Sequence, residues 1–448
     1  MLSPRNAQAA AEGVVERAIR AGADAADALY AGQRSTSVEV RLGDLEHVGR
    51  SEDEEIGLRV FVGARSASVA SSDLSKEALG ELVKRALAMA GQTPEDPFAG
   101  LAPPELLGGP PFPDIDSVDP VEPDLEELRR RALAAERAAL AVDGVTNSSG
   151  GSADASGSTV ALATSAGFVG ARSATGFSCS VAVVAGEGGQ MQRDHAWHGA
   201  RHLSDLDPAE RIGRLAGERA VSRLEPARPK SGPMPVLFDP RVSHTLLGHL
   251  AGAISGSSVA RKSSFLQDKL GSRIFAAGVA IIDDPLRLRG LRSRPFDGEG
   301  LRVQRTEIVA DGVLHTWMAD SASARQLGID PTGHSARGAG SAPGVSPSNF
   351  YMAAGKRSRP ELLAAFPEAL LVTELIGQGA NPVTGDYSRG AAGFLVRNGE
   401  IGPAVQEITI ASNLLDMFAT LEPASDLELR HGIDAPTLLI PQMTVGTA

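Results

Sequence analysis

The chain has 448 residues, of which 42% are hydrophobic and 22% charged, so it is long enough for two or three globular domains and is not intrinsically disordered. Its net charge of −12 excludes the basic surface by which proteins bind nucleic acid without sequence preference. No apolar run approaches the roughly 18 residues of a membrane span and the N-terminus has no secretory signal pattern, so we expect a cytoplasmic protein without membrane contact.

The first 92 residues alternate between helical and strand patterns. Residues 4–22 carry apolar side chains at helical spacing, and residues 26–72 then alternate apolar and polar side chains, as strands do. A second helix is expected over 75–89, with Ser75 as its N-cap. We therefore predict an N-terminal α+β domain over residues 1–92, with helices on one face of a mostly antiparallel sheet.

A dense set of prolines over residues 93–123 predicts a connector between domains. It separates the N-terminal domain from a central α+β region over 124–232. This region begins with a helix over 124–142, continues with strands over 145–200 and ends with a helix over 207–224. The residues Asp-Pro-Ala-Glu at the start of the last helix predict an aspartate N-cap, followed by proline at the first helical position.

The third region covers residues 233–448 and is expected to be rich in strands. A buried strand at about 235–238 leads into a helix that carries two histidines. Beyond about residue 275 the chain shows short strands and turns, with one helix near 359–366, a pattern typical of a barrel or sandwich. The predicted fold class is α+β, with N-terminal helix-and-sheet domains followed by a mostly β, barrel- or sandwich-like C-terminal domain.

The single cysteine excludes an intrachain disulfide and any zinc site built from several cysteines. Cys179 lies in an alternating run of small and apolar residues. This pattern favours a small strand residue over a nucleophile.

The segment that carries His244 and His249 resembles the metal-binding helix of a zinc peptidase but lacks its catalytic glutamate. In such a helix a glutamate follows the first histidine and takes a proton from the metal-bound water. Here that position is Thr245, whose hydroxyl is not a general base near neutral pH. Two histidines five residues apart also diverge by roughly 140° around a regular helix. We predict no catalytic residue and no metal ligand in this chain, expect a structural role for His249, and regard His244 as the residue worth testing.

Two other clusters have ligand-like composition but are better explained as structure. The histidines of the first would share one face of a helix, yet they follow a glycine-rich strand and suit a strand edge, without a glutamate base beside them. The acidic residues of the second lie in turn-like sequences, where aspartate accepts hydrogen bonds from its own backbone, rather than in a magnesium or calcium site. The first cluster is His195, His198 and His202, and the second is Asp283, Asp284, Asp297 and Glu299.

The densest glycine segment, residues 377–390, offers backbone groups rather than a reactive side chain. It lacks the Gly-Lys-Ser/Thr end of a phosphate-binding loop, and Ser388 lacks the Gly-x-Ser-x-Gly frame of a nucleophile elbow. An extended peptide can pair with such an edge by strand addition. Asp386, Ser388 and Arg389, the polar side chains of this loop, are our candidates for peptide binding.

Ordered motifs over residues 235–420 resemble the TldD/PmbA family (the modulator of DNA gyrase family), and specifically its PmbA branch, also called TldE. Earlier residues are similar to the family through their helix-and-strand layout. The motifs include Pro295-Phe296-Asp297-Gly298-Glu299-Gly300, Thr373-Glu374-Leu375-Ile376-Gly377-Gln378-Gly379 and Thr384-Gly385-Asp386-Tyr387-Ser388-Arg389-Gly390.

The resemblance implies a partnership between two chains. The TldD branch is a zinc peptidase with a His-Glu-x-x-x-His motif and a distant cysteine ligand, whereas the PmbA branch lacks that site and pairs with TldD around an enclosed chamber. The complex is associated with proteolysis of unfolded or extended peptides. Residues 431–435, where a cysteine ligand would be sought, contain none. The resemblance therefore implies no cofactor here and zinc in a TldD-like partner, and the acidic charge favours an indirect effect on gyrase over DNA contact.

Three functions follow from these observations. The leading one is a metal-free subunit of a cytoplasmic TldD/TldE-type metalloprotease complex. The first alternative is a self-sufficient metallopeptidase that uses His244 and His249 with a further ligand. The second is a homodimeric binding or regulatory protein that acts without proteolysis. Co-purification with a chain that carries the His-Glu-x-x-x-His motif separates the first from the others.

Overall fold

The structure is a computed structural model that describes residues 1–447. Its first half is organised around β1 (Ala25–Arg41), whose side chains alternate between two faces. Tyr30 lies in an apolar cluster with the N-terminal helices, whereas Leu29 lies on the opposite face in a cluster with Phe296. The period-two alternation of this strand therefore buries both faces of the sheet.

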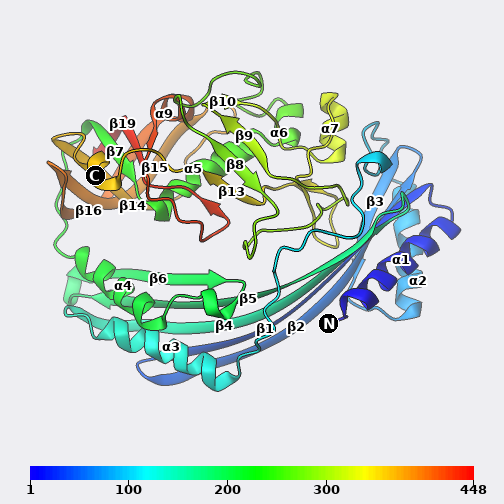
Figure 1. Cartoon of the computed structure of the whole chain (residues 1–448), viewed down its shortest axis with the longest axis horizontal. Coiled ribbons are helices and arrows are strands. Elements are labelled where there is room, and N and C mark those ends of the chain that lie inside the picture. Colours follow the sequence, from blue (N-terminus) through cyan, green and yellow to red (C-terminus); the bar gives the residue numbers. More distant parts are fainter. Residues whose placement is uncertain (448) are drawn as a thin grey trace.

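β1 belongs to a six-stranded antiparallel sheet in the order β3-β2-β1-β4-β5-β6. Figure 1 shows this sheet as a long curved surface, with the C-terminal half of the chain over its concave side. Helices α1 and α2 pack on one end of the sheet, and α3 and α4 pack on the other. The other bounds are β2 (Asp44–Val62), β3 (Arg65–Ser71), β4 (Val145–Thr164), β5 (Val169–Ala185), β6 (Gln192–Ala200), α1 (Pro4–Arg20), α2 (Lys76–Ala90), α3 (Leu125–Leu140) and α4 (Ala209–Ser222).

The helices and strands predicted before residue 224 are confirmed, with shifts of a few residues at their ends. Strand β1 pairs with both β2 and β4, so the N-terminal and central regions share one sheet. Within residues 93–123 the chain forms one short 3-10 helix, Pro104–Leu106, and otherwise runs as an irregular segment.

The predicted aspartate N-cap of α4 is wrong. The helix begins at Ala209 after Pro208, and no side chain caps it. The Asp207 carboxylate instead forms ion pairs with Arg430 and, at 3.4 Å, with Arg211. A tertiary ion pair to the C-terminal half has displaced the local cap that the sequence suggests.

The C-terminal half contains a closed barrel, one of the two architectures that the sequence predicts. β7 pairs with β14 in parallel and with β19 in antiparallel register, and β14, β15 and β16 continue in antiparallel order. β16 then pairs with β19 and closes the ring. Helix α5 follows β7 and buries Leu246 and Leu250 in the same apolar core as Phe238. The bounds are β7 (Gly232–Phe238), β14 (Glu368–Ile376), β15 (Asp386–Arg397), β16 (Glu400–Asn413), β19 (Leu438–Thr447) and α5 (Pro240–Ala253).

A second sheet of short strands, in the order β10-β9-β8-β13-β18, lies beside the barrel. The helix predicted near 359–366 is α8 (Arg359–Leu363), but the prediction of a single helix in this region is wrong. α7 (Ser321–Leu327) and α9 (Leu414–Thr420) have only seven residues each, too few for a visible apolar period. The remaining bounds are α6 (Gly256–Ala260), β8 (Ile281–Asp284), β9 (Thr306–Ala310), β10 (Val313–Leu314), β11 (Ser335–Ala336), β12 (Gly344–Val345), β13 (Asn349–Met352), β17 (Glu422–Pro423) and β18 (Ile433–Asp434).

Two members of the acidic cluster form the predicted turns. The Asp284 carboxylate accepts a hydrogen bond from the Leu286 N–H at 3.1 Å, and the Asp297 carboxylate accepts one from the Glu299 N–H at 2.9 Å. Asp283 differs, since it lies in strand β8 and its buried carboxylate accepts hydrogen bonds from the backbone and hydroxyl of Ser348 at 2.6 and 2.7 Å.

Cys179 lies in β5 with 1% of its surface exposed, as its alternating sequence predicts. Burial raises the pKa of its thiol to about 12. This strand residue therefore lacks the thiolate character that a nucleophile requires. Within residues 1–447, no helix combines the length and apolar character that a membrane span requires.

Candidate functional site

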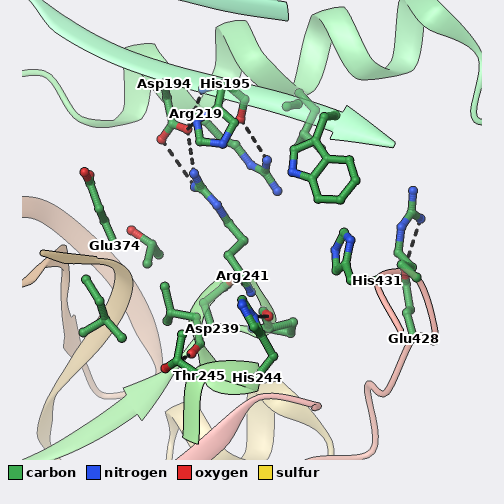
Figure 2. Close-up of a pocket in the computed structure, with 18 of the residues that line it drawn as sticks. Asp194, His195, Arg219, Asp239, Arg241, His244, Thr245, Glu374, Glu428 and His431 are labelled. Carbon is green, nitrogen blue, oxygen red and sulfur yellow. Dashed lines mark hydrogen bonds and ion pairs between the residues drawn. The ribbon is translucent and has the colours of Figure 1, made fainter. Parts of the chain in front are cut away.

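A cleft of about 1080 Å³ lies between the curved sheet and the barrel. β6 and α4 form one wall, and the first turns of α5 with the facing parts of β14 and β15 form the other (Figure 2). Residues 426–435 also contribute to the lining. Most of the lining side chains are arginines and carboxylates, so this is a polar site and not a buried apolar pocket.

His244 faces this cleft because of how α5 begins. The Asp239 carboxylate caps the helix and Pro240 occupies its first position, which fixes the phase of the following turn. Nδ1 of His244 lies 3.5 Å from the carbonyl oxygen of Pro240. The neighbouring Thr245 hydroxyl donates a hydrogen bond to the Val242 carbonyl at 2.6 Å. The residues on either side of His244 are Ser243 and Thr245, and neither hydroxyl is a general base near neutral pH.

His249, in contrast, does not line the cleft. Its ring meets Tyr387 edge-on, with 5.9 Å between ring centroids, and its buried Nε2 has no hydrogen-bond partner within residues 1–447. Burial, and then the charge of Arg389, lowers the pKa of His249. The neutral imidazole fits an apolar packing position, and the helix separates it from His244.

His431 is a cleft residue that we did not single out from the sequence. It packs on Trp197 of β6, with 4.6 Å between ring centroids and 43° between the ring planes. Burial lowers its pKa, against the opposing charge of Asp434, and His244 adds to the lowering. Within residues 1–447 no group of three or more His, Cys, Asp or Glu side chains could hold a metal ion. The residues therefore do not fit a catalytic zinc, which requires three protein ligands.

The histidine cluster of residues 195–202 follows β6, the edge strand that the sequence favours, and does not converge. His195 is exposed on the cleft side. His198 accepts a hydrogen bond from the Asp207 backbone at Nδ1, 3.0 Å away. Nε2 of His202 lies 3.0 Å from the Asp116 carbonyl oxygen. The three imidazole rings therefore lie in separate surroundings and do not form one site.

An ion-pair network joins the two walls of the cleft (Figure 2). The buried Asp194 of β6 accepts from Arg241 of α5 at 2.6 Å and pairs with Arg223 at 3.4 Å. Arg223 also pairs with Glu374 of β14 at 2.5 Å. Burial raises the pKa of Asp194, but the bonds and charges of the arginines outweigh it and leave this pKa below its ordinary value. No local sequence pattern could reveal this network, because its members come from distant elements.

The three predicted peptide-binding residues lie at the start of β15 and not in a loop. Asp386 accepts hydrogen bonds from the Thr384 hydroxyl at 2.7 Å and from the Asn413 side chain at 3.2 Å. Ser388 is exposed. Only Arg389 lines the cleft, so the structure does not bring the three together at one site.

This architecture is that of a metallopeptidase family. The chain matches domain 1 of the PmbA/TldA metallopeptidases over residues 26–90, their central domain over 118–224 and their C-terminal domain over 231–447. The chain belongs to the PmbA/TldD family.

Particular relatives agree in sequence and in fold. The chain is 40% identical over 424 residues to metalloprotease PmbA of Escherichia coli O157:H7, covering 94% of this chain and 92% of the relative. It is 36% identical over 434 residues to a PmbA homologue of Haemophilus influenzae, covering 96% and 94%. The structure of a candidate modulator of DNA gyrase from Bacteroides thetaiotaomicron has a TM-score of 0.91 at 26% identity, with both chains fully covered. TldE from Thermococcus kodakarensis has a TM-score of 0.81 at 18% identity, covering 97% and 99%, which is a likeness of fold alone.

Proposed function

We propose that this chain is the metal-free subunit of a cytoplasmic TldD/TldE-type peptidase complex that cleaves unfolded or extended peptides. A TldD-like partner supplies the zinc and the general base, and this chain supplies a wall of the chamber. The names of the relatives, metalloprotease PmbA and TldE, support the reaction class and the type of partner.

The arrangement of α5 carries this proposal. Only one of its two histidines faces the cleft, and the hydroxyl of Thr245 is engaged with the helix backbone. Hydrolysis at a catalytic zinc requires three protein ligands and a nearby base, and this turn offers one imidazole and no base. This arrangement supports the proposal that the chemistry is carried out by another chain.

Co-expression with a TldD-like chain tests the proposal. We expect the two chains to co-purify, and the complex, but neither chain alone, to cleave an unstructured peptide. Replacing the glutamate of the partner's His-Glu-x-x-x-His motif by glutamine should lower the rate by roughly 10²–10⁴-fold, because a general base is lost. His244→Ala in this chain should change the rate far less. Stoichiometric zinc together with peptidase activity in this chain alone would contradict the proposal.

A further inference from the structure

The charged side chains that line the cleft are not all paired with one another. Every carboxylate in the lining accepts an ion pair or a hydrogen bond from the described residues. Three arginines of the same lining, Arg193, Arg219 and Arg389, form no ion pair within residues 1–447. A protein with a net charge of −12 thus places arginines that form no ion pair in this cleft.

Arg219 is the most constrained of these three. It projects from α4 and is only partly exposed. Among residues 1–447 its guanidinium forms one hydrogen bond, from Nη1 to the carbonyl oxygen of His195, 3.1 Å away, so the other guanidinium N–H groups have no partner there. Burial, and then the charge of Arg241, lowers the pKa of Arg219 to about 10. A partly desolvated guanidinium that forms no ion pair gains free energy when an anion binds to it directly.

The neighbouring strand adds the rest of a binding site. Arg193, His195 and Trp197 are every second residue of β6, so their side chains share one face of the strand, and all three line the cleft. Trp197 is 46% exposed, and His431 packs on its ring to form an aromatic ledge. β6 is also the last strand of its sheet, so its outer edge runs along the site. The cleft therefore combines an anion-binding group, Arg219, with the aromatic ledge and the edge of strand β6 (Figure 2).

We propose that this cleft binds the C-terminal carboxylate of an extended peptide, with Arg219 as the principal donor. A planar carboxylate matches the fork of guanidinium N–H groups. The ledge of Trp197 and His431 then receives the terminal side chain, which a bare inorganic anion lacks. The inference rests on the proposed function and assigns the metal-free subunit a role in selecting free peptide ends.

Tryptophan fluorescence of the full chain tests this directly. Of the two tryptophans, Trp197 lines the cleft and Trp317 is 5% exposed, so the change in emission reports the cleft. The probes are one unstructured decapeptide in two forms, with a free C-terminal carboxylate and with a C-terminal amide. We expect the acid to bind at least roughly tenfold more tightly than the amide, as a charge-assisted bidentate contact implies.

Arg219→Gln should abolish this preference, with melting temperature as the check on folding. Arg214→Gln is the matched control, because Arg214 is an exposed residue of the same helix outside the cleft lining. It should leave the acid-to-amide ratio unchanged.

Equal affinity for acid and amide, or no binding of either peptide, would overturn the inference, as would an unchanged preference in folded Arg219→Gln. Inorganic phosphate that changes the tryptophan emission while neither peptide does would identify a simple anion site and also overturn the inference. None of these outcomes tests the proposed function. That function is tested by peptide cleavage by the complex with the TldD-like partner.

Discussion

Asp297 is a carboxyl group whose surroundings oppose its ionisation. It is 2% exposed and accepts hydrogen bonds from the backbone N–H groups of Glu299 and Leu301, each at 2.9 Å. Burial, followed by the charge of the nearby Glu299 carboxylate, raises the pKa of Asp297 to about 7. In the unfolded chain the same group titrates near its ordinary value of about 3.9.

The titration of Asp297 predicts a pH dependence of stability. Between about pH 4 and 7 the folded state keeps a proton that the unfolded state has lost, so this group's contribution to stability falls as pH rises. Relative to Asp297→Asn, the wild-type chain should lose free energy of unfolding across this window, with a slope approaching about 1.4 kcal/mol per pH unit. Urea denaturation from pH 4 to 8 measures the difference, with the exposed Asp330→Asn as control. Parallel wild-type and variant curves would exclude a raised pKa.

At the scale of elements, one glycine allows a segment of the C-terminal half to lie against the long sheet. A Cβ on Gly57 of β2 would lie 1.6 Å from the carbonyl oxygen of Ala339. Two residues earlier, the buried Arg337 side chain pairs with Asp27 of β1. The close approach of backbone to strand therefore requires glycine at position 57.

Gly57→Ala should destabilise the protein by about 1–3 kcal/mol, because the added methyl forces the segment of Ala339 away from the sheet. Gly80→Ala in α2 is the control, since a Cβ at that position would meet no other atom within 4 Å. That change should stabilise the helix by about 0.5–1 kcal/mol. Thermal melts measure both, and equal melting temperatures for Gly57→Ala and the wild type would show that the segment adjusts freely.

The sequence reveals elements in proportion to their length. α1 and α3 have enough turns for an apolar stripe, and β1 has enough residues for an alternation, so both kinds of pattern were visible. α7 and α9 were missed because seven residues make only two turns, although Asp320 and Asn413 cap them. The cap of α4 is mispredicted because the Asp207 carboxylate pairs with Arg430, a residue distant in sequence that no local pattern reveals.

At the scale of the whole molecule, the cleft could be predicted only in part. His244 was found because a motif on one helix points to it. Arg219 and Trp197 were not, because neither belongs to a motif and both become cleft residues only when β6 and α4 face α5. Residues that act together across a domain interface carry no local signature, whereas residues spaced along one helix do.

The same interface supplies a prediction about how the two halves hold together. Asp194 is buried between Arg223 and Arg241, so it links the sheet to the first turn of α5. Asp194→Asn would leave Arg241 without its ion-pair partner and Arg223 with Glu374 alone. Removing one partner of a buried ion pair typically costs about 3–5 kcal/mol. We expect urea denaturation of the variant to start earlier and to separate unfolding of the barrel from that of the sheet.

The contribution of Asp194 to stability should depend on pH in a defined direction. Because the arginines hold the pKa of Asp194 below its ordinary value, its contribution is present above about pH 4 and is lost as pH falls through the folded-state pKa. The stability gap between wild type and Asp194→Asn should therefore close at low pH. Glu46→Gln is the control, because its 3.8 Å pair with Arg41 is half exposed and contributes at most about 1 kcal/mol. A gap that persists unchanged to pH 2 would show that packing, and not charge, makes Asp194 important.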